Sequence, residues 1–156
     1  MNVENLHKEW IRLGERLSKN SLLLDSIWKK IEKKYTGKKR HYHIYSMLQL
    51  AEENKNQIRD MDILLFSIWF HDIIYNPSKQ NNEEKSADYA KSIAEKFSLK
   101  KDQIKKLHQL ILSTKSHQIL VSKDNAYLLD FDLSILGQNW EIYQAYINNI
   151  RKEYSI

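Results

Sequence analysis

A histidine and an aspartate, His71 and Asp72, stand side by side within the apolar segment Ile68–Tyr75. Burying an imidazole next to a carboxylate costs free energy unless a further group pairs with them. A divalent metal ion is such a group, because it takes a neutral imidazole nitrogen and an ionised carboxylate oxygen as ligands. The structural alternative is a histidine favoured by the helix dipole, followed by an aspartate that opens the exit turn. The apolar run favours the metal interpretation, because it predicts deep burial.

A second carboxylate suited to a metal lies far along the chain, in the apolar segment Leu128–Leu136. Two aspartates interrupt this segment, and their spacing of two residues places them on opposite sides of a helix. On the helical wheel Asp132 lies between Leu129 and Leu136, so we predict that Asp132 faces the core. The alternative is a capping or salt-bridged aspartate without a functional role.

A histidine-rich stretch, Arg40–His43, precedes a predicted helix and should lie around its first turn. An arginine can clamp a phosphate with its planar guanidinium group, and a histidine can donate a proton to a leaving group. A single histidine at such a place is more often a hydrogen-bonded or exposed residue. Two histidines and an arginine together point to function as strongly as to structure.

Two further clusters lie at predicted helix ends, Asn81–Ser86 and Thr114–His117. In the first, acidic residues would complement the dipole at a helix start. In the second, cationic residues would do so at a helix end. Each cluster is equally consistent with a helix cap and with the wall of an active site.

The elements that must position these residues are helices. Apolar residues recur at three and four positions along almost the whole chain, and no strand pattern is visible. The predicted helices are Leu6–Leu17, Ser21–Tyr35, His43–Asn54, Met61–Ile74, Asn82–Phe97, one opened by Asp102, Asn125–Leu136 and Trp140–Tyr154. The fourth is nearly all apolar and should be central. We therefore expect an all-α orthogonal bundle of seven to eight helices.

Composition narrows the class of protein further. A length of 156 residues suggests one domain spanning 1–156, and 3 Gly with 1 Pro argue against a turn-rich β sandwich. The absence of cysteine excludes disulfides, thiolate zinc sites and a cysteine nucleophile. The N-terminus is polar and no long apolar run exists, so we expect a cytoplasmic protein without a membrane span. The net charge of +5 comes from scattered lysines, which indicate solvated helix faces more than a nucleic-acid surface.

Taken together, the motifs resemble a bacterial family, the predicted metal-dependent HD-domain phosphohydrolases. The resemblance covers nearly the whole chain and is specific for membership, although not for substrate. The matching segments, in the order in which the family has them, are Trp10, Arg40–His43, Trp69–Asp72 with Tyr75, Asn82–Ala87, Thr114–His117 and Asp130–Gly137.

The resemblance implies a divalent metal ion (manganese, iron, zinc or magnesium) held by His71, Asp72 and Asp132. One position departs from the family pattern, because Met47 stands where the family has a further histidine ligand. A thioether is a poor ligand for such ions, so the affinity should be lower. His43, one turn earlier on the same face, either compensates or serves as a general acid or phosphate contact, which is the role that the resemblance favours.

The activity implied is hydrolysis of a nucleotide or another small phosphate ester. Arg40 and Lys115 are expected to offset the charge of the phosphate. His43 or His117 is expected to protonate the leaving oxygen, and Glu83 to orient the attacking water. This family usually continues beyond Arg151–Tyr154 with a helical hairpin. Without it, apolar surface on the last helix would promote association into a homo-oligomer.

Two other interpretations stay open. The first is a catalytically degenerate HD-fold module that binds a ligand without a metal, which Met47 favours. The second is a basic helical nucleic-acid binder. It requires a one-sided lysine stripe, whereas the lysine pairs fall on several predicted helices.

Overall fold

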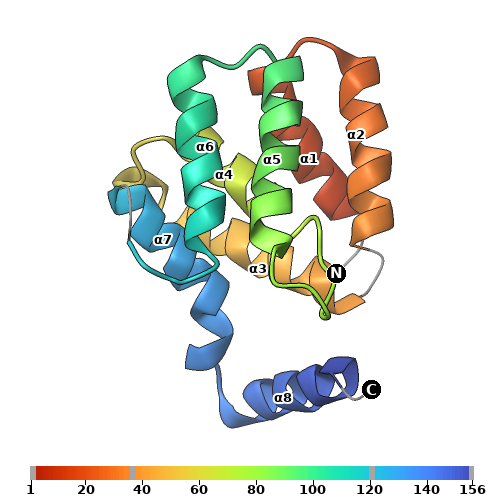
Figure 1. The fold of residues 1–156 in the computed structure, drawn as a ribbon, viewed down its shortest axis with the longest axis vertical. Helices are drawn as coiled ribbons and strands as arrows, with labels where there is room; N and C mark the ends of the chain where they lie inside the picture. The colour runs from red at the N-terminus through yellow and green to blue at the C-terminus, as the bar shows by residue number, and fades with distance from the viewer. Residues whose placement is uncertain (1–2, 36–37, 120–121, 155–156) are drawn as a thin grey trace.

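In the part of the chain that the structure describes, the regular elements are eight α-helices and two short 3₁₀ turns (Figure 1). The computed structural model describes residues 3–35, 38–119 and 122–154, without the side chains of 38–42, 149–150 and 152–154. Within those ranges there is no strand, so the predicted all-α class is confirmed. The helices are α1 (Val3–Leu17), α2 (Ser21–Lys34), α3 (Lys38–Glu53), α4 (Met61–Phe70), α5 (Asn82–Lys96), α6 (Lys101–Ser113), α7 (Lys123–Asp132) and α8 (Trp140–Tyr154). The 3₁₀ turns are η1 (Lys55–Gln57) and η2 (Leu133–Gly137).

Helix α4 is central, as its almost entirely apolar sequence predicts. Its residues Ile63, Leu64 and Phe66–Phe70 are buried, and α1, α3, α5, α6 and α7 all pack against it. In Figure 1 it lies behind α5 and α6. The carboxylate of Asp60 accepts the backbone N–H of Ile63 at 3.2 Å and so caps the start of the helix. The core packing and this cap together position α4, whose C-cap is His71.

Trp10 of α1 anchors the aromatic part of this core. Its side chain is fully buried, with the rings of Trp69, Phe70 and Phe97 at centroid distances of 5.9, 5.9 and 6.2 Å. The indole N–H donates to the backbone carbonyl of Leu24 at 3.1 Å. A buried indole needs such a partner, and this one ties α1 to α2 while the ring packs on α4.

Among the helix boundaries that differ from the sequence prediction, those at the start of α3 and the end of α4 concern the site. Helix α3 begins at Lys38 instead of His43, so His43 lies in its second turn. Helix α4 ends at Phe70 instead of Ile74, with His71 as its C-cap. Beyond that point the N–H of Ile74 donates to the hydroxyl of Ser86 on α5 at 3.0 Å. A side chain of α5 thus satisfies a backbone group that the longer helix would have bonded internally.

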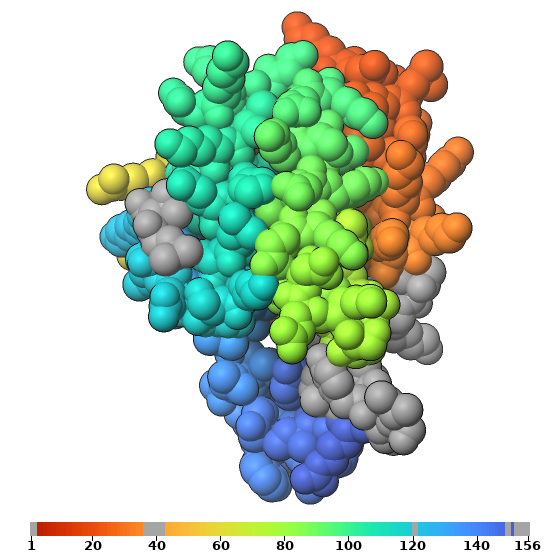
Figure 2. All heavy atoms as spheres, in the orientation of Figure 1, coloured from red at the N-terminus to blue at the C-terminus, as the bar shows by residue number. Residues whose placement is uncertain are grey.

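The last part of the chain lies at one end of the molecule. Helix α7 stops at Asp132 and continues as η2, where one helix over Asn125–Leu136 was predicted. Helix α8 follows and packs mainly on η2, and the two form the lower end in Figures 1 and 2. Leu136 and Trp140 are 57% and 67% exposed. Apolar surface is therefore present here, and the predicted association through it stays a prediction. None of the described helices has the length and apolarity needed to cross a membrane.

Candidate metal centre

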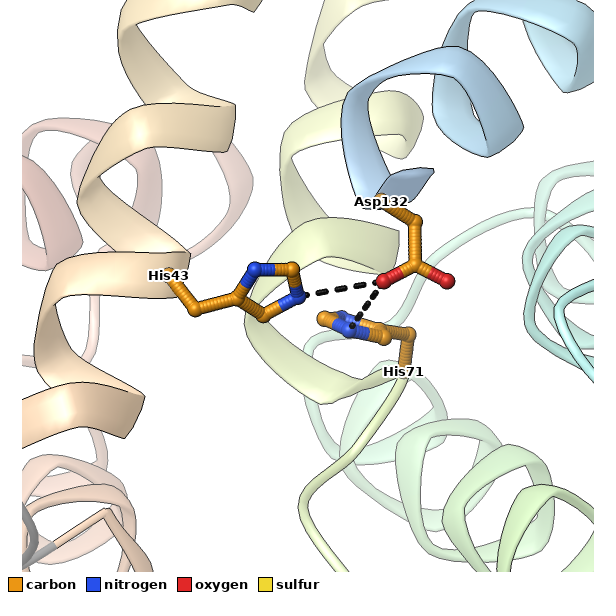
Figure 3. Close-up of side chains that lie close together, drawn as sticks. All are labelled: His43, His71 and Asp132. Atoms are coloured by element: carbon orange, nitrogen blue, oxygen red, sulfur yellow. Dashed lines mark hydrogen bonds and ion pairs between the residues drawn. The ribbon is translucent and has the colours of Figure 1, made fainter. Parts of the chain in front are cut away.

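Three imidazoles converge on the carboxylate of Asp132, the last residue of α7. His43 Nε2 lies 3.1 Å and His71 Nε2 3.6 Å from Oδ1, and His117 Nε2 lies 3.0 Å from Oδ2. The two histidines on Oδ1 approach from neighbouring helices, α3 and α4 (Figure 3). The Asp132 side chain is 17% exposed, whereas Asp130 is exposed. The helical-wheel prediction that Asp132 is the inward residue is therefore confirmed.

His71 is held in one orientation by the helix that it caps. It is buried, and its Nδ1 lies 2.8 Å from the carbonyl oxygen of Ile68. A carbonyl only accepts, so Nδ1 carries the proton. In the neutral ring Nε2 then bears a lone pair that faces an oxygen of Asp132. Two facing lone pairs require a cation between them, which is either a proton or a metal ion.

The electrostatics of the site favour positive charge. Burial alone would lower the pKa of His71, but the hydrogen bond and charge of Asp132, with the charge of Asp72, raise it to about 8. Burial alone would likewise raise the pKa of Asp132. The hydrogen bonds from His117, His43 and His71 outweigh it, and the pKa lies well below its usual value. Asp132 is therefore an ionised carboxylate at every pH of interest, surrounded by groups that neutralise it.

The donor atoms fit a divalent metal ion. One ligand atom from each of His43, His71 and Asp132 lies within 4.8 Å of the other two. Two ligands held about 2.1 Å from a zinc-sized ion in a tetrahedral arrangement are about 3.4 Å apart. The observed separations of 3.1 and 3.6 Å from Asp132 Oδ1 lie on either side of that value. Imidazole nitrogens with a carboxylate oxygen suit zinc, iron and manganese. The carbonyl of Ile68 fixes the orientation and tautomer of the His71 ring, as hydrogen bonds to metal-binding histidines commonly do.

The structure brings His43 into this group and leaves Asp72 outside it. Asp72 is half-buried and acts on His71 through its charge. Asp72 as a ligand stays a prediction, whereas the suggestion that His43 compensates for Met47 is consistent with the geometry. Met47 is fully buried one turn after His43 and offers no hard donor. His43 was left out of the expected ligands because the family resemblance favours it as a general acid or phosphate contact.

His117 reaches Asp132 from the turn that follows α6. Its backbone has φ of 51°, and its N–H donates to the carbonyl of Ser113 at 2.9 Å, which closes the helix end. Histidine is among the non-glycine residues enriched in this left-handed region. The hydrogen bond to Asp132 raises the pKa of His117 against a smaller opposing effect of burial, and the charges of Asp132 and Glu83 add to the increase.

The remaining predicted site residues lie around this centre. Lys115 donates to the backbone carbonyl of Gln80 at 2.9 Å and forms an ion pair with Glu84. Glu84, a partner that the sequence analysis did not single out, sits in the expected Asn-Glu-Glu segment. Glu83 is half-buried, and its negative charge contributes to the raised pKa of His117. Arg40 belongs to α3, but its side chain lies outside the described residues.

Comparisons of the chain with protein-family models, with curated proteins and with solved structures found no match. The resemblance to HD-domain phosphohydrolases therefore rests on the sequence motifs.

Proposed function

We propose that this protein is a metal-dependent phosphohydrolase of the HD type that acts on a nucleotide or another small phosphate ester. The observation that carries the proposal is the convergence of His43 and His71 on one oxygen of Asp132. These three residues would hold the ion, and catalytic metal sites commonly use three such protein ligands with an open position. A divalent ion bound there would polarise a phosphoryl oxygen and lower the pKa of a bound water.

His117 is the residue best suited to protonate the leaving oxygen. It approaches the opposite carboxylate oxygen, Asp132 Oδ2, and its side chain is 34% exposed, so a substrate can reach it. Its raised pKa keeps the ring protonated closer to neutral pH, as a general acid requires. A histidine that binds a metal must be neutral and cannot donate that proton. The proposal therefore assigns His43 to the metal and His117 to proton donation.

Lys115 provides positive charge near the same turn. Its ion pair with Glu84 is partly exposed on both sides, and pairs of this kind contribute little free energy. A phosphate dianion can therefore compete with Glu84 for the ammonium group. Arg40 is the second candidate for this role because its helix also carries His43.

The test is metal-dependent turnover of phosphate esters by purified protein. Substrates would be p-nitrophenyl phosphate, bis-p-nitrophenyl phosphate and nucleoside monophosphates, with added manganese, iron or zinc. His71→Ala should abolish turnover. His108→Ala is the matched control, because His108 also pairs with an aspartate, Asp88, at 3.0 Å, but at the surface between α6 and α5. Full metal-dependent activity in the His71→Ala variant would contradict the proposal.

A second candidate is an HD-type binding module without a metal. Met47 favours it, because a fully buried thioether occupies the position where a further ligand is expected. In that case protons on the histidines would hold Asp132, consistent with the raised pKa of His71. Protein that takes up no metal at any of the tested concentrations would favour this candidate over the hydrolase.

A further inference from the structure

Two adjacent polar side chains in the first turn of α7, Asp124 and Asn125, are fully buried. They lie on the same helix as Asp132, Asp124 eight residues and Asn125 seven residues earlier, which is about 10–12 Å along the axis. A buried charge persists only when it is paired, and replacing it by apolar groups is often neutral or stabilising. Packing of α7 on the core would be served equally well by apolar residues such as Leu128. Packing alone therefore does not account for two polar residues at these positions, whereas their hydrogen-bond partners do.

Asp124 ties the start of α7 to the start of α4. One carboxylate oxygen accepts the backbone N–H of Arg59 at 2.8 Å, and the other accepts that of Asp60 at 3.1 Å. Lys106 of α6 donates to the second oxygen at 2.6 Å. Burial would raise the pKa of Asp124, but the bonds from Lys106 and Arg59 outweigh it and lower the pKa. The carboxylate thus stays charged while it fixes the helix that carries His71 at its far end.

Asn125 ties the same turn of α7 to the end of α6. Its amide donates to the hydroxyl of Ser113 at 2.6 Å, and both residues are fully buried. The carbonyl of Ser113 in turn accepts the backbone N–H of His117. A side-chain contact at one end of α7 is therefore connected, through one residue, to the turn from which His117 reaches Asp132.

We infer that Asp124 and Asn125 are positioning residues for the candidate metal centre. They hold the start of α7 in register with α4 and α6, and the rigid helix then sets how far Asp132 reaches toward His71 and His117. This inference rests on the proposed function, because it assigns the two residues an effect on metal affinity. It also predicts an effect on the metal-free histidine rings, which is independent of that function.

The experiment compares Asp124→Asn and Asn125→Ala with Leu24→Ala. Leu24 is buried on α2, which packs on α1, so its truncation loosens the core away from α7. All variants are titrated with zinc and manganese below their unfolding temperatures. The positioning variants should bind at least tenfold more weakly than wild type, whereas Leu24→Ala should bind like wild type even at an equal loss of Tm. Wild-type affinity in both positioning variants would overturn the inference.

A second variant and a second readout serve for two cases in which the metal titration fails. In the first case Asp124→Asn does not fold, and in the second the wild type binds no metal. Lys106→Met leaves both backbone bonds of Asp124 in place and takes the place of Asp124→Asn if that variant does not fold. In metal-free protein at a fixed pH, the ring ¹⁵N shifts of His71 and His117 report their contacts with Asp132. These shifts should change in Lys106→Met and Asn125→Ala and stay constant in Leu24→Ala. Unchanged shifts would overturn the inference, whereas absent metal binding with changed shifts would contradict only the proposed function.

Discussion

His71 Nε2 lies 3.6 Å from Asp132 Oδ1, while the other ring nitrogen of His71 is committed to a backbone carbonyl. The neutral ring therefore presents a lone pair to a carboxylate, and the contact is stable only with a cation in between. A proton fills that role in the metal-free protein, and a divalent ion can replace it. Metal and proton thus compete for one position, so metal binding should release a proton.

The metal-free protein should lose stability as the pH rises above neutrality. The pKa of His71 is about 8 in the folded protein and about 6.5 in the unfolded chain. A raised pKa contributes stability that is fully present below pH 6.5 and is lost as the pH passes through 8. The loss should be at most about 2 kcal/mol. Urea unfolding in EDTA at intervals between pH 6 and pH 9 would measure it.

Two variants test the origin of this pH dependence: His71→Asn removes the titrating group, and His108→Ala is the control. The first variant should remove the part of this loss that His71 contributes, while the part contributed by His117, whose pKa Asp132 also raises, should remain. The second variant should leave the curve unchanged. Asp132 acts in the opposite direction, because its lowered pKa contributes stability above pH 4 that is lost in acid. A wild-type stability that rises between pH 6.5 and 8.5 would contradict the assignment of a proton to this contact.

Replacing each of the two candidate third ligands in turn should show which of them binds the metal. The geometry of the structure indicates His43, whereas the sequence motif implies Asp72. His43 belongs to the group of close ligand atoms and Asp72 does not. His43→Asn should weaken zinc binding by about two orders of magnitude or more, because it removes a ligand atom. Asp72→Asn should weaken it by only about tenfold, because Asp72 acts on His71 through its charge. Isothermal titration calorimetry would measure both affinities. The reverse order would restore Asp72 as the ligand.

Replacing Met47 by histidine should lower the stability of the metal-free protein and raise its affinity for metal. Met47 is fully buried and lies four residues after His43 on the same face of α3. An imidazole there is a poorly satisfied buried polar group without metal, so Tm in EDTA should fall. With zinc present the extra donor should bind and restore Tm to at least the wild-type value. Met47→Leu, which keeps the volume, should change neither metal affinity nor the effect of zinc on Tm.

Truncating Trp10 should test the core that holds α4 in place. The ring is fully buried among aromatic rings, and its N–H is bonded to Leu24. Trp10→Ala should cost about 3–5 kcal/mol, because it leaves a cavity and an unpaired carbonyl. Urea unfolding at pH 7 would measure the change. Exposed Trp140, at 67%, provides the control, because Trp140→Ala should cost less than about 1 kcal/mol. Similar losses in both variants would contradict this view of the core.

The sequence predicts an element of the fold where a local pattern of residues is enough to determine that element. The apolar run before His71 predicted a central helix, and α4 is central. The early end of α4 was not predictable, because it depends on Ser86 of α5 taking the N–H of Ile74. Such a contact joins residues of different elements and leaves no periodicity in the sequence.

The site was predictable in its residue types more than in their arrangement. His71 and Asp132 were expected to act together, and the structure places His71 Nε2 3.6 Å from Asp132 Oδ1; their role as metal ligands stays a prediction. Adjacent helical residues point about 100° apart, so His71 and Asp72 do not have to share one ion. His43 was expected to contact the phosphate or the leaving group, whereas the structure places its Nε2 3.1 Å from Asp132 Oδ1. That distance depends on how α3 packs beside α7, which leaves no pattern in the sequence.

The most direct test of the central claim is the metal content of untagged protein after exposure to zinc or manganese and removal of the excess, for wild type and Asp132→Asn. If His43, His71 and Asp132 hold a metal ion, we expect near-stoichiometric metal in the wild type and almost none in Asp132→Asn. Circular dichroism should be alike for the two proteins. A folded wild type that retains no metal, or an Asp132→Asn variant that retains as much as wild type, would contradict the claim.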